Sequence, residues 1–189
     1  MSKAKTRCHW CGDDPLYVAY HDQEWGRPVH DDRHLFELLI LEGAQAGLSW
    51  ITVLRKRENY RAAFDGFDPV KVAAYDEAKL ASLMENPGIV RNRLKLASAV
   101  RNAKVFLAIQ KEFGSFDRYL WGFVDGQVQR RRPADRKALL ASNALSDRIA
   151  KDLKKRGMNF VGTTIIYAYL QACGIIDDHI ADCFLATRA

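Results

Sequence analysis

The sequence lacks long apolar runs, low-complexity stretches and any segment in which apolar and polar residues alternate clearly. Without about 20 consecutive apolar residues, no membrane-spanning helix is predicted. The basic start MSKAKTR is not followed by an apolar signal segment, so we expect a cytoplasmic protein with no membrane partner. The missing alternation argues against a sandwich or barrel and favours an all-α fold.

Cysteine is scarce, with four residues at positions 8, 11, 173 and 183. In a reducing compartment such cysteines are metal ligands or buried thiols rather than disulfide partners. The remaining composition, 48% hydrophobic and 28% charged over 189 residues, is that of one ordinary globular domain. We therefore predict a single domain over residues 1–189.

Positive charge is in modest excess, at +6, and gathers in three short clusters. Each cluster by itself is typical of a solvated helix face or loop. Three of them in a basic domain favour a polyanionic partner such as nucleic acid. The clusters are Arg55-Lys56-Arg57, Arg130-Arg131-Arg132 and Lys154-Lys155-Arg156.

Apolar residues at spacings of three and four predict eight to ten short helices, forming a core over about residues 31–175. An irregular N-terminal loop is predicted at residues 8–30 and a C-terminal tail at 176–189. Residues 125–141, which contain glycine, proline and the arginine triplet, are predicted to form an exposed loop. The expected helices follow Asp31 or Asp32, Ser49, Asp68, Asp76, the turn Asn86-Pro87-Gly88, Ser115, Ser142 or Ser146, and Gly162.

Five side chains at the two ends of the chain have the chemistry of zinc ligands. A tetrahedral site made from four of them would join the N-terminal loop to the C-terminus and would be structural, because it keeps no open position. The alternative is a set of scattered buried thiols and surface histidines. The candidates are Cys8, Cys11, His21, His179 and Cys183.

Two turns have features suited to a DNA backbone. In residues 160–164, FVGTT, Gly162 allows close approach, and the next helix begins with N–H groups that can face a phosphate. This is the arrangement of a helix-hairpin-helix clamp. The turn at residues 86–93, NPGIVRNR, has similar features and remains a competing candidate.

The stretch LEGAQAGLSW, residues 41–50, places one carboxylate, Glu42, at the end of an apolar helix. Aromatic residues are abundant nearby and in the N-terminal segment, where no helical or strand period orders them. A carboxylate among aromatic faces attracts a flat, cationic guest, although core packing is the ordinary role of aromatic side chains. The aromatic residues are Trp10, Tyr17, Tyr20, Trp25 and Trp50.

Long motifs of this chain resemble the bacterial 3-methyladenine DNA glycosylase I family of the helix-hairpin-helix superfamily. The resemblance extends over about residues 7–183 and is weakest at 125–141. The motifs are DPLYVAYHDQEWG (14–26), LEGAQAGLSWITVLRKRENYRAAF (41–64), FDPVKVAAY (67–75), KKRGMNFVGTTIIYAYLQACG (154–174) and DDHIADC (177–183).

The resemblance implies an all-α glycosylase-like fold with one structural zinc ion between the chain ends. By position it implies the zinc ligands Cys8, His21, His179 and Cys183, and leaves Cys11 without a role. Glu42 matches the carboxylate that holds the extruded base, with Tyr20 and Trp50 stacking and Trp10, Tyr17 and Trp25 around them. Leu48 matches the wedge that enters the duplex, beside Gln45 and Gly47, while Gly162, Thr163 and Thr164 match the hairpin contact to DNA.

These expectations define a monomeric DNA repair enzyme that flips 3-methyladenine out of alkylated double-stranded DNA and hydrolyses its glycosidic bond. The methylated base carries positive charge and already leaves easily, and no lysine nucleophile lies in the pocket motifs, so no lyase activity is expected. Two alternatives remain open. One is a zinc-stabilised damage binder without catalysis, and the other is a hydrolase with metal ligands in His21-Asp22 and Asp178-His179.

Overall fold

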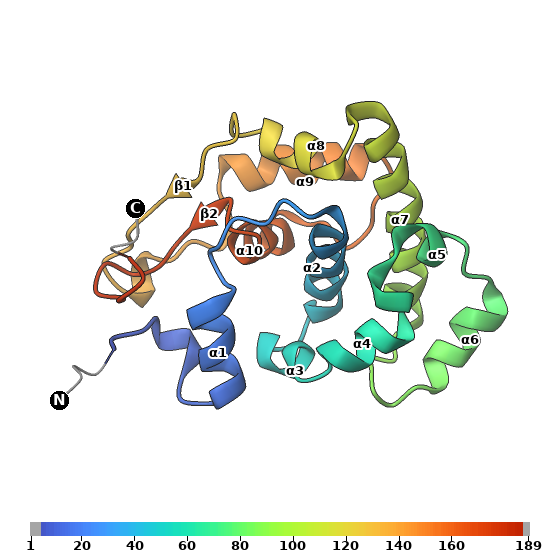
Figure 1. Ribbon diagram of the computed structural model, residues 1–189, viewed down its shortest axis with the longest axis horizontal. Coiled ribbons are helices and arrows are strands. Elements are labelled where there is room, and N and C mark those ends of the chain that lie inside the picture. Colours follow the sequence, from blue (N-terminus) through green and yellow to red (C-terminus); the bar gives the residue numbers. More distant parts are fainter. Residues whose placement is uncertain (1–4, 187–189) are drawn as a thin grey trace.

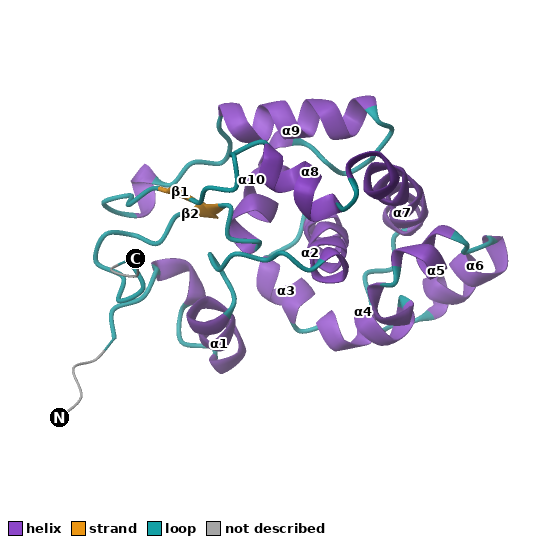
Figure 2. Ribbon diagram, turned by 45° about the horizontal axis from the view of Figure 1, so that its top comes forward, coloured by secondary structure: helices purple, strands orange, loops and turns teal. Residues whose placement is uncertain are grey.

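The computed structural model describes residues 5–186; the predictions for residues 1–4 and 187–189 lie outside this range. The prediction of an all-α fold is confirmed, since the described chain contains ten α-helices and only one pair of two-residue strands (Figures 1 and 2). The elements are α1 Pro15–Gln23, α2 Asp32–Gln45, α3 Trp50–Leu54, α4 Arg57–Ala63, α5 Pro69–Ala73, α6 Glu77–Glu85, α7 Arg93–Phe113, α8 Phe116–Gly122, β1 Gln129–Arg130, α9 Ala144–Lys155, α10 Thr163–Ala172 and β2 Ile176–Asp177, with 3₁₀ turns at His9–Cys11, Asp65–Phe67 and Arg136–Ala138.

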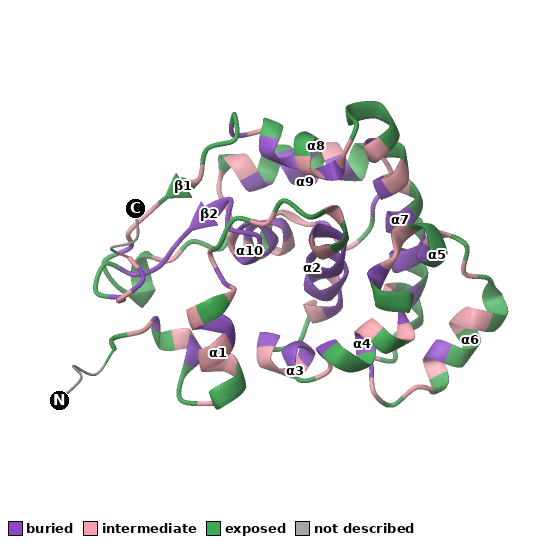
Figure 3. Cartoon of the chain, viewed as in Figure 1, coloured by how far each residue is buried: buried purple, intermediate pink, exposed green. Residues whose placement is uncertain are grey.

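Helix α2 forms the centre of the molecule. Its residues 35–42 are all buried, so the helix is covered on every side (Figure 3). A helix without a polar face is stable in water only when other elements surround it. Helices α10, α7, α8 and α3 contact it. Its first turn also joins the next layer, because the Asp32 carboxylate accepts the backbone N–H groups of Phe116 (2.8 Å) and Asp117 (2.8 Å) at the start of α8.

The prediction of an irregular loop over residues 8–30 is wrong for the middle of that segment, where helix α1 forms. Asp14 caps α1 by accepting the N–H groups of Leu16 and Tyr17, and Pro15 occupies the first helical position. This Asp-Pro start is the same signal that opens α5 at Asp68, where the sequence did predict a helix. Helix α1 was not predicted because its aromatic residues lie against both a pocket and the core. This arrangement obscures the helical period in the sequence.

The sequence predicts one helix after Ser49 that carries the basic triplet Arg55-Lys56-Arg57 on a solvated face. The chain instead bends between α3 and α4, and Arg57 is buried. Its guanidinium donates to Glu37 on α2 and to Glu24 after α1, with Arg57 Nη1 2.6 Å from Glu24 Oε2. A buried arginine is stable when carboxylates pair with it. The prediction that the Arg57 side chain faces solvent is therefore wrong.

The segment predicted as an exposed loop at residues 125–141 is held against the C-terminal segment. Strands β1 and β2 pair in parallel, with Gln129 opposite Ile176 and Arg130 opposite Asp177. The two following arginines, Arg131 and Arg132, form ion pairs with Asp178 and Asp177. Strands of two residues give no alternation in the sequence, so only the folded chain reveals this pairing.

Both ends of the described chain lie on the same side of the molecule (Figure 1). The backbone N–H of Phe184 donates to the Thr6 carbonyl at 2.9 Å, which joins them directly. Among the described residues, no helix is long and apolar enough to cross a bilayer.

Candidate active site and metal centre

A cavity of about 210 Å³ opens at the C-terminal end of α2. Five elements and one loop meet there: the first 3₁₀ turn, α1, the end of α2, the start of α3, one face of α10, and the segment after residue 138. The lining residues are Trp10, Tyr17, Tyr20, Trp25, Glu42, Gln45, Trp50, Leu139, Leu140, Ala168 and Gln171. The structure thus gathers all five predicted aromatic residues around the predicted carboxylate.

Among the described residues that line this cavity, Glu42 alone is acidic, and it is 4% exposed. Burial alone raises the pKa of its carboxyl group to about 8. Within residues 5–186, Glu42 Oε2 and the indole Nε1 of Trp50 are buried polar atoms without a hydrogen-bond partner. Unsatisfied buried groups are costly, so two of them in one pocket indicate that a polar ligand completes the site.

The aromatic rings form the walls of the cavity. The ring centroids of Tyr20 and Trp50 are 5.5 Å apart, and Trp10 lies 5.0 Å from Tyr17 and 4.9 Å from Trp25. Burial, reinforced by the nearby Glu42 carboxylate, raises the pKa of Tyr17 to about 12. This phenol therefore stays neutral at physiological pH. A flat π-electron surface with one buried carboxyl group suits a planar cationic guest.

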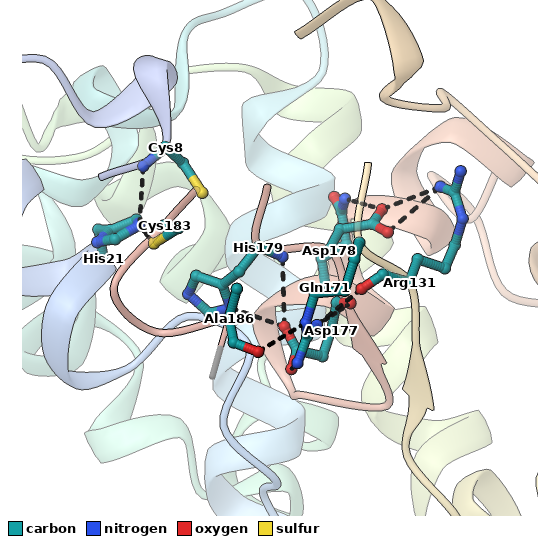
Figure 4. A network of polar contacts seen from close by, with 10 residues as sticks. Cys8, His21, Arg131, Gln171, Asp177, Asp178, His179, Cys183 and Ala186 are labelled. Carbon is teal, nitrogen blue, oxygen red and sulfur yellow. Dashed lines mark hydrogen bonds and ion pairs between the residues drawn. The ribbon is translucent and has the colours of Figure 1, made fainter. Parts of the chain in front are cut away.

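Leu139, Leu140 and Gln171 line the pocket although the sequence singled out none of them. Gln171 Nε2 donates to Asp178 Oδ2 at 2.8 Å, and Arg131 reaches the same carboxylate from the segment that carries the two leucines (Figure 4). The spacing of Tyr167 and Gln171 on α10 could have indicated a shared face. No local signal could have placed Leu139 and Leu140 at the pocket.

The predicted wedge residues follow Glu42 in a turn at the end of α2. Gln45 lines the cavity, Gly47 adopts a left-handed φ of 79°, and Leu48 is 40% exposed. Glycine adopts positive φ without the steric cost that other residues meet, which allows the turn at this position. An exposed leucine beside a buried pocket is suited to enter an apolar gap in a partner.

The turn between α9 and α10 lies close to this wedge turn. A β-carbon placed on Gly43 would be 3.5 Å from the β-carbon of Phe160, so the end of α2 contacts the hairpin directly. Asn102 on α7 holds the hairpin by bonding both the N–H and the carbonyl of Asn159, each at 2.9 Å. Gly162 is the N-cap residue of α10 and offers no side-chain cap, so the first-turn N–H groups at Thr163 and Thr164 remain open to an external acceptor.

Three of the predicted zinc ligands, Cys8, His21 and Cys183, have ligand atoms within 4.8 Å of one another. Figure 4 shows them between the N-terminal segment and the C-terminal turn. Cys11 is not part of this group; its thiol instead donates to the Cys8 carbonyl at 3.1 Å. His179 is close by, since its ring centroid is 5.2 Å from that of His21.

The donor set fits a zinc ion. His179 Nε2 is buried and has no partner within residues 5–186, while its Nδ1 lies 2.7 Å from Asp177 Oδ1. His21 shares the carboxylate on Nδ1, which lies 2.8 Å from Asp22 Oδ1, while its Nε2 faces the Cys8 backbone N–H at 3.3 Å and the Cys183 thiol at 3.5 Å. Carboxylates on Nδ1 orient metal-binding histidines and leave Nε2 for the ion. Burial raises the pKa of the Cys8 thiol to about 12, so a cation is needed to hold it as thiolate.

The same contacts argue against an open hydrolase centre at the His-Asp pairs. Asp178 is fully buried and accepts from Tyr167, Gln171 and Arg131. Asp22 is occupied by Arg7, whose Nη2 is 2.8 Å from Asp22 Oδ2. In the described chain, neither carboxylate belongs to the group of close ligand atoms.

Known proteins share both the sequence and this architecture. Residues 10–186 match the family model described as Methyladenine glycosylase. DNA-3-methyladenine glycosylase 1 of Escherichia coli K12 is 49% identical over 94% of this chain and 95% of its own length. A crystal structure of 3-methyladenine DNA glycosylase I superimposes with a TM-score of 0.92 at 52% identity, covering 95% of this chain and 98% of that one.

A second solved structure is a variant of 3-methyladenine DNA glycosylase I in complex with 3-methyladenine. It has a TM-score of 0.93 at 36% identity, covering 96% of this chain and 98% of that one. Both solved structures thus match nearly the whole chain. The chain therefore belongs to the methyladenine glycosylase family.

Proposed function

We propose that this protein is a DNA glycosylase that hydrolyses the bond between 3-methyladenine and deoxyribose in alkylated double-stranded DNA and so initiates base excision repair. One observation carries the proposal: a buried carboxyl group with an unpartnered oxygen, Glu42, in an aromatic cavity of about 210 Å³, in a member of this family. The solved relative bound to 3-methyladenine supports the choice of base.

Glu42 selects the cationic base in this proposal. In the empty pocket its raised pKa keeps a large fraction protonated at neutral pH. When the N3-methylated base enters, its positive charge favours the carboxylate, so Glu42 releases its proton to solvent water and holds the base by charge and hydrogen bonding. An unmodified adenine has no charge to offset the cost of a buried carboxylate. Discrimination therefore follows from the desolvation of one side chain.

Tyr20 and Trp50 stack on the base, and Trp10, Tyr17 and Trp25 complete its enclosure. The methylated base is a good leaving group, so the carboxylate orients it and stabilises the oxocarbenium-like sugar while water attacks the anomeric carbon. Among the lining residues there is no lysine to form a Schiff base. We infer monofunctional hydrolysis without lyase activity.

DNA is engaged by two neighbouring elements. Leu48 fills the space that the extruded base leaves in the duplex, with Gln45 and Gly47 beside it. The N–H groups at Gly162, Thr163 and Thr164 hold a backbone phosphate as a helix-hairpin-helix motif. The contact between Gly43 and Phe160 supports a joint role for the wedge turn and the hairpin, because it keeps the two elements adjacent. Base flipping costs least at a damaged, weakly paired base.

One zinc ion held by Cys8, His21, His179 and Cys183 would stabilise the fold by joining the two ends of the chain. This role requires no open coordination position and no part in the chemical step. We further propose that the enzyme acts as a monomer in the cytosol.

The test is release of free base from methylated duplex DNA, resolved by chromatography, for the wild-type protein and Glu42→Gln. Release of 3-methyladenine by the wild type and its loss in the variant are expected. Binding without release would support the non-catalytic damage binder. Strand breakage without alkali would contradict monofunctional chemistry.

A further inference from the structure

Lys95, in the first turn of α7, contacts the turn that carries the wedge residues. Its half-buried ammonium group donates to the carbonyl oxygens of Ala44 at 2.8 Å and Ala46 at 2.6 Å. These residues flank Gln45, which lines the pocket. Lys95 is therefore 49 to 51 positions from its partners in sequence and in direct contact with them in the fold.

The backbone of this turn depends on Lys95 for half of its carbonyl hydrogen bonds. The Gly43 carbonyl accepts the N–H of Ala46 at 3.4 Å, and the Gln45 carbonyl accepts the N–H of Leu48 at 2.6 Å. The carbonyls of Ala44 and Ala46 instead accept hydrogen bonds from Lys95. Carbonyls at a helix C-terminus have no intrahelical donor and carry negative partial charge, so an ammonium group stabilises them well.

Helix α7 supports the DNA-facing hairpin through a second residue on the same face. Asn102 follows Lys95 by seven positions, or about two helical turns, which places it on the same side. It binds the N–H and carbonyl of Asn159 in the hairpin turn. One helix thus holds the wedge turn and the hairpin at a set separation. Burial lowers the pKa of Lys95, which agrees with an ammonium group removed from solvent.

We propose that Lys95 is a positioning residue for base extrusion: it holds the turn from Ala44 to Leu48 so that Leu48 meets the duplex in the correct place. This inference rests on the proposed role of Leu48 as the wedge. Lys95 acts through backbone carbonyls and contacts neither the base nor a phosphate. Its loss should impair work on duplex DNA and spare recognition of the free base.

The experiment compares Lys95→Met with wild type in two assays. Excision of 3-methyladenine from duplex DNA is measured in single turnover, and binding of free 3-methyladenine is followed by tryptophan fluorescence. We expect excision from duplex to fall about tenfold or more, because two hydrogen bonds to a charged group are lost. Binding of the free base should stay within about twofold, since Lys95 does not line the pocket.

Three variants control the result. Lys95→Arg keeps a charged multiple donor and should recover most of the duplex activity. Lys104→Met removes an exposed charge from the same helix and should leave both assays unchanged. The double variant of Lys95→Met with Leu48→Ala should be little worse than either single variant, because residues acting as one unit show non-additive effects.

Several outcomes overturn the proposal. Equal losses in duplex excision and free-base binding would make Lys95 a general structural residue. A smaller salt dependence of DNA binding in Lys95→Met, by about one unit of slope, would make it a phosphate contact instead. If Leu48→Ala impairs duplex excision and Lys95→Met does not, the Lys95 inference alone fails. If Leu48→Ala has no effect, the wedge role fails first, and the Lys95 inference fails with it.

Discussion

Replacing Glu42 with glutamine should make the free protein more stable at alkaline pH while it lowers activity. Burial raises the pKa of the Glu42 carboxyl group from its usual 4.5 to about 8. A raised folded-state pKa contributes stability in full below pH 4.5, and that stability is lost as pH rises through 8. Glutamine does not ionise and escapes this loss.

The size of the effect follows from the shift. Each pH unit between the two pKa values costs the wild type about 1.4 kcal/mol, so the loss is on the order of 3 kcal/mol at pH 7 and 4 kcal/mol near pH 8. The buried amide introduces an opposite, pH-independent cost of about 1–3 kcal/mol where its N–H groups lack acceptors. The variant should therefore be less stable than wild type near pH 5 and more stable near pH 8.

Urea unfolding of both proteins at pH 5, 6, 7 and 8 measures this difference in free energy. The informative quantity is how the difference in free energy of unfolding changes with pH, because the cost of the buried amide shifts that difference by the same amount at every pH. Tyr17 and Tyr20 line the same pocket, and the pKa of each lies above this range, so neither contributes to the slope. A difference that does not change with pH would refute a buried, desolvated Glu42. In the excision assay the same variant should lose about 10- to 150-fold in kcat/KM, as expected for a charged hydrogen bond.

Three further changes test separate parts of the structure. In the wild type, kcat/KM for excision should rise with pH up to about 8 as free Glu42 ionises, and a flat profile would contradict the carboxylate as the active form. If zinc joins the chain ends as proposed, Cys183→Ala should abolish zinc binding and lower Tm by roughly 10 °C while excision at low temperature persists, which metal analysis and calorimetry can check. Gly174→Ala should cost several kcal/mol in urea unfolding, because the added β-carbon would lie 2.1 Å from the Arg27 carbonyl carbon at a φ of 73°. Gly126→Ala has a similar φ of 71° and open space, so it should cost only about 1 kcal/mol, and equal losses would argue against the Arg27 contact.

Residues near one another in the chain carried most of what could be predicted about the pocket. Glu42 and Trp50 lie in one continuous motif, and the predicted aromatic set does line one cavity. The zinc candidates were also recognisable, because thiols and imidazoles are distinctive even when they are far apart in sequence. The structure brings Cys8, His21 and Cys183 together, and the ion itself stays a proposal.

The predictions failed where one local sequence pattern is compatible with both an exposed and a buried environment. Arg57 belongs to a basic triplet typical of a solvated face, yet Glu37 and Glu24 draw it into the interior. Residues 125–141 have the composition of an exposed loop, yet Leu139 and Leu140 cover the pocket. In both cases the deciding partner comes from a distant element, so no window of neighbouring residues contains the information.

The sequence by itself determined the helical architecture, since caps, apolar periodicity and glycine turns act over a few residues. It also determined the chemical inventory: one carboxylate among aromatic rings and a set of thiol and imidazole ligands. Only the tertiary structure decided that Glu42 is desolvated enough to shift its pKa, because burial is supplied by α1, α3 and α10 together. It likewise decided that Lys95 holds the wedge turn, because hydrogen bonds across about 50 residues exist only once α2 and α7 have packed against each other.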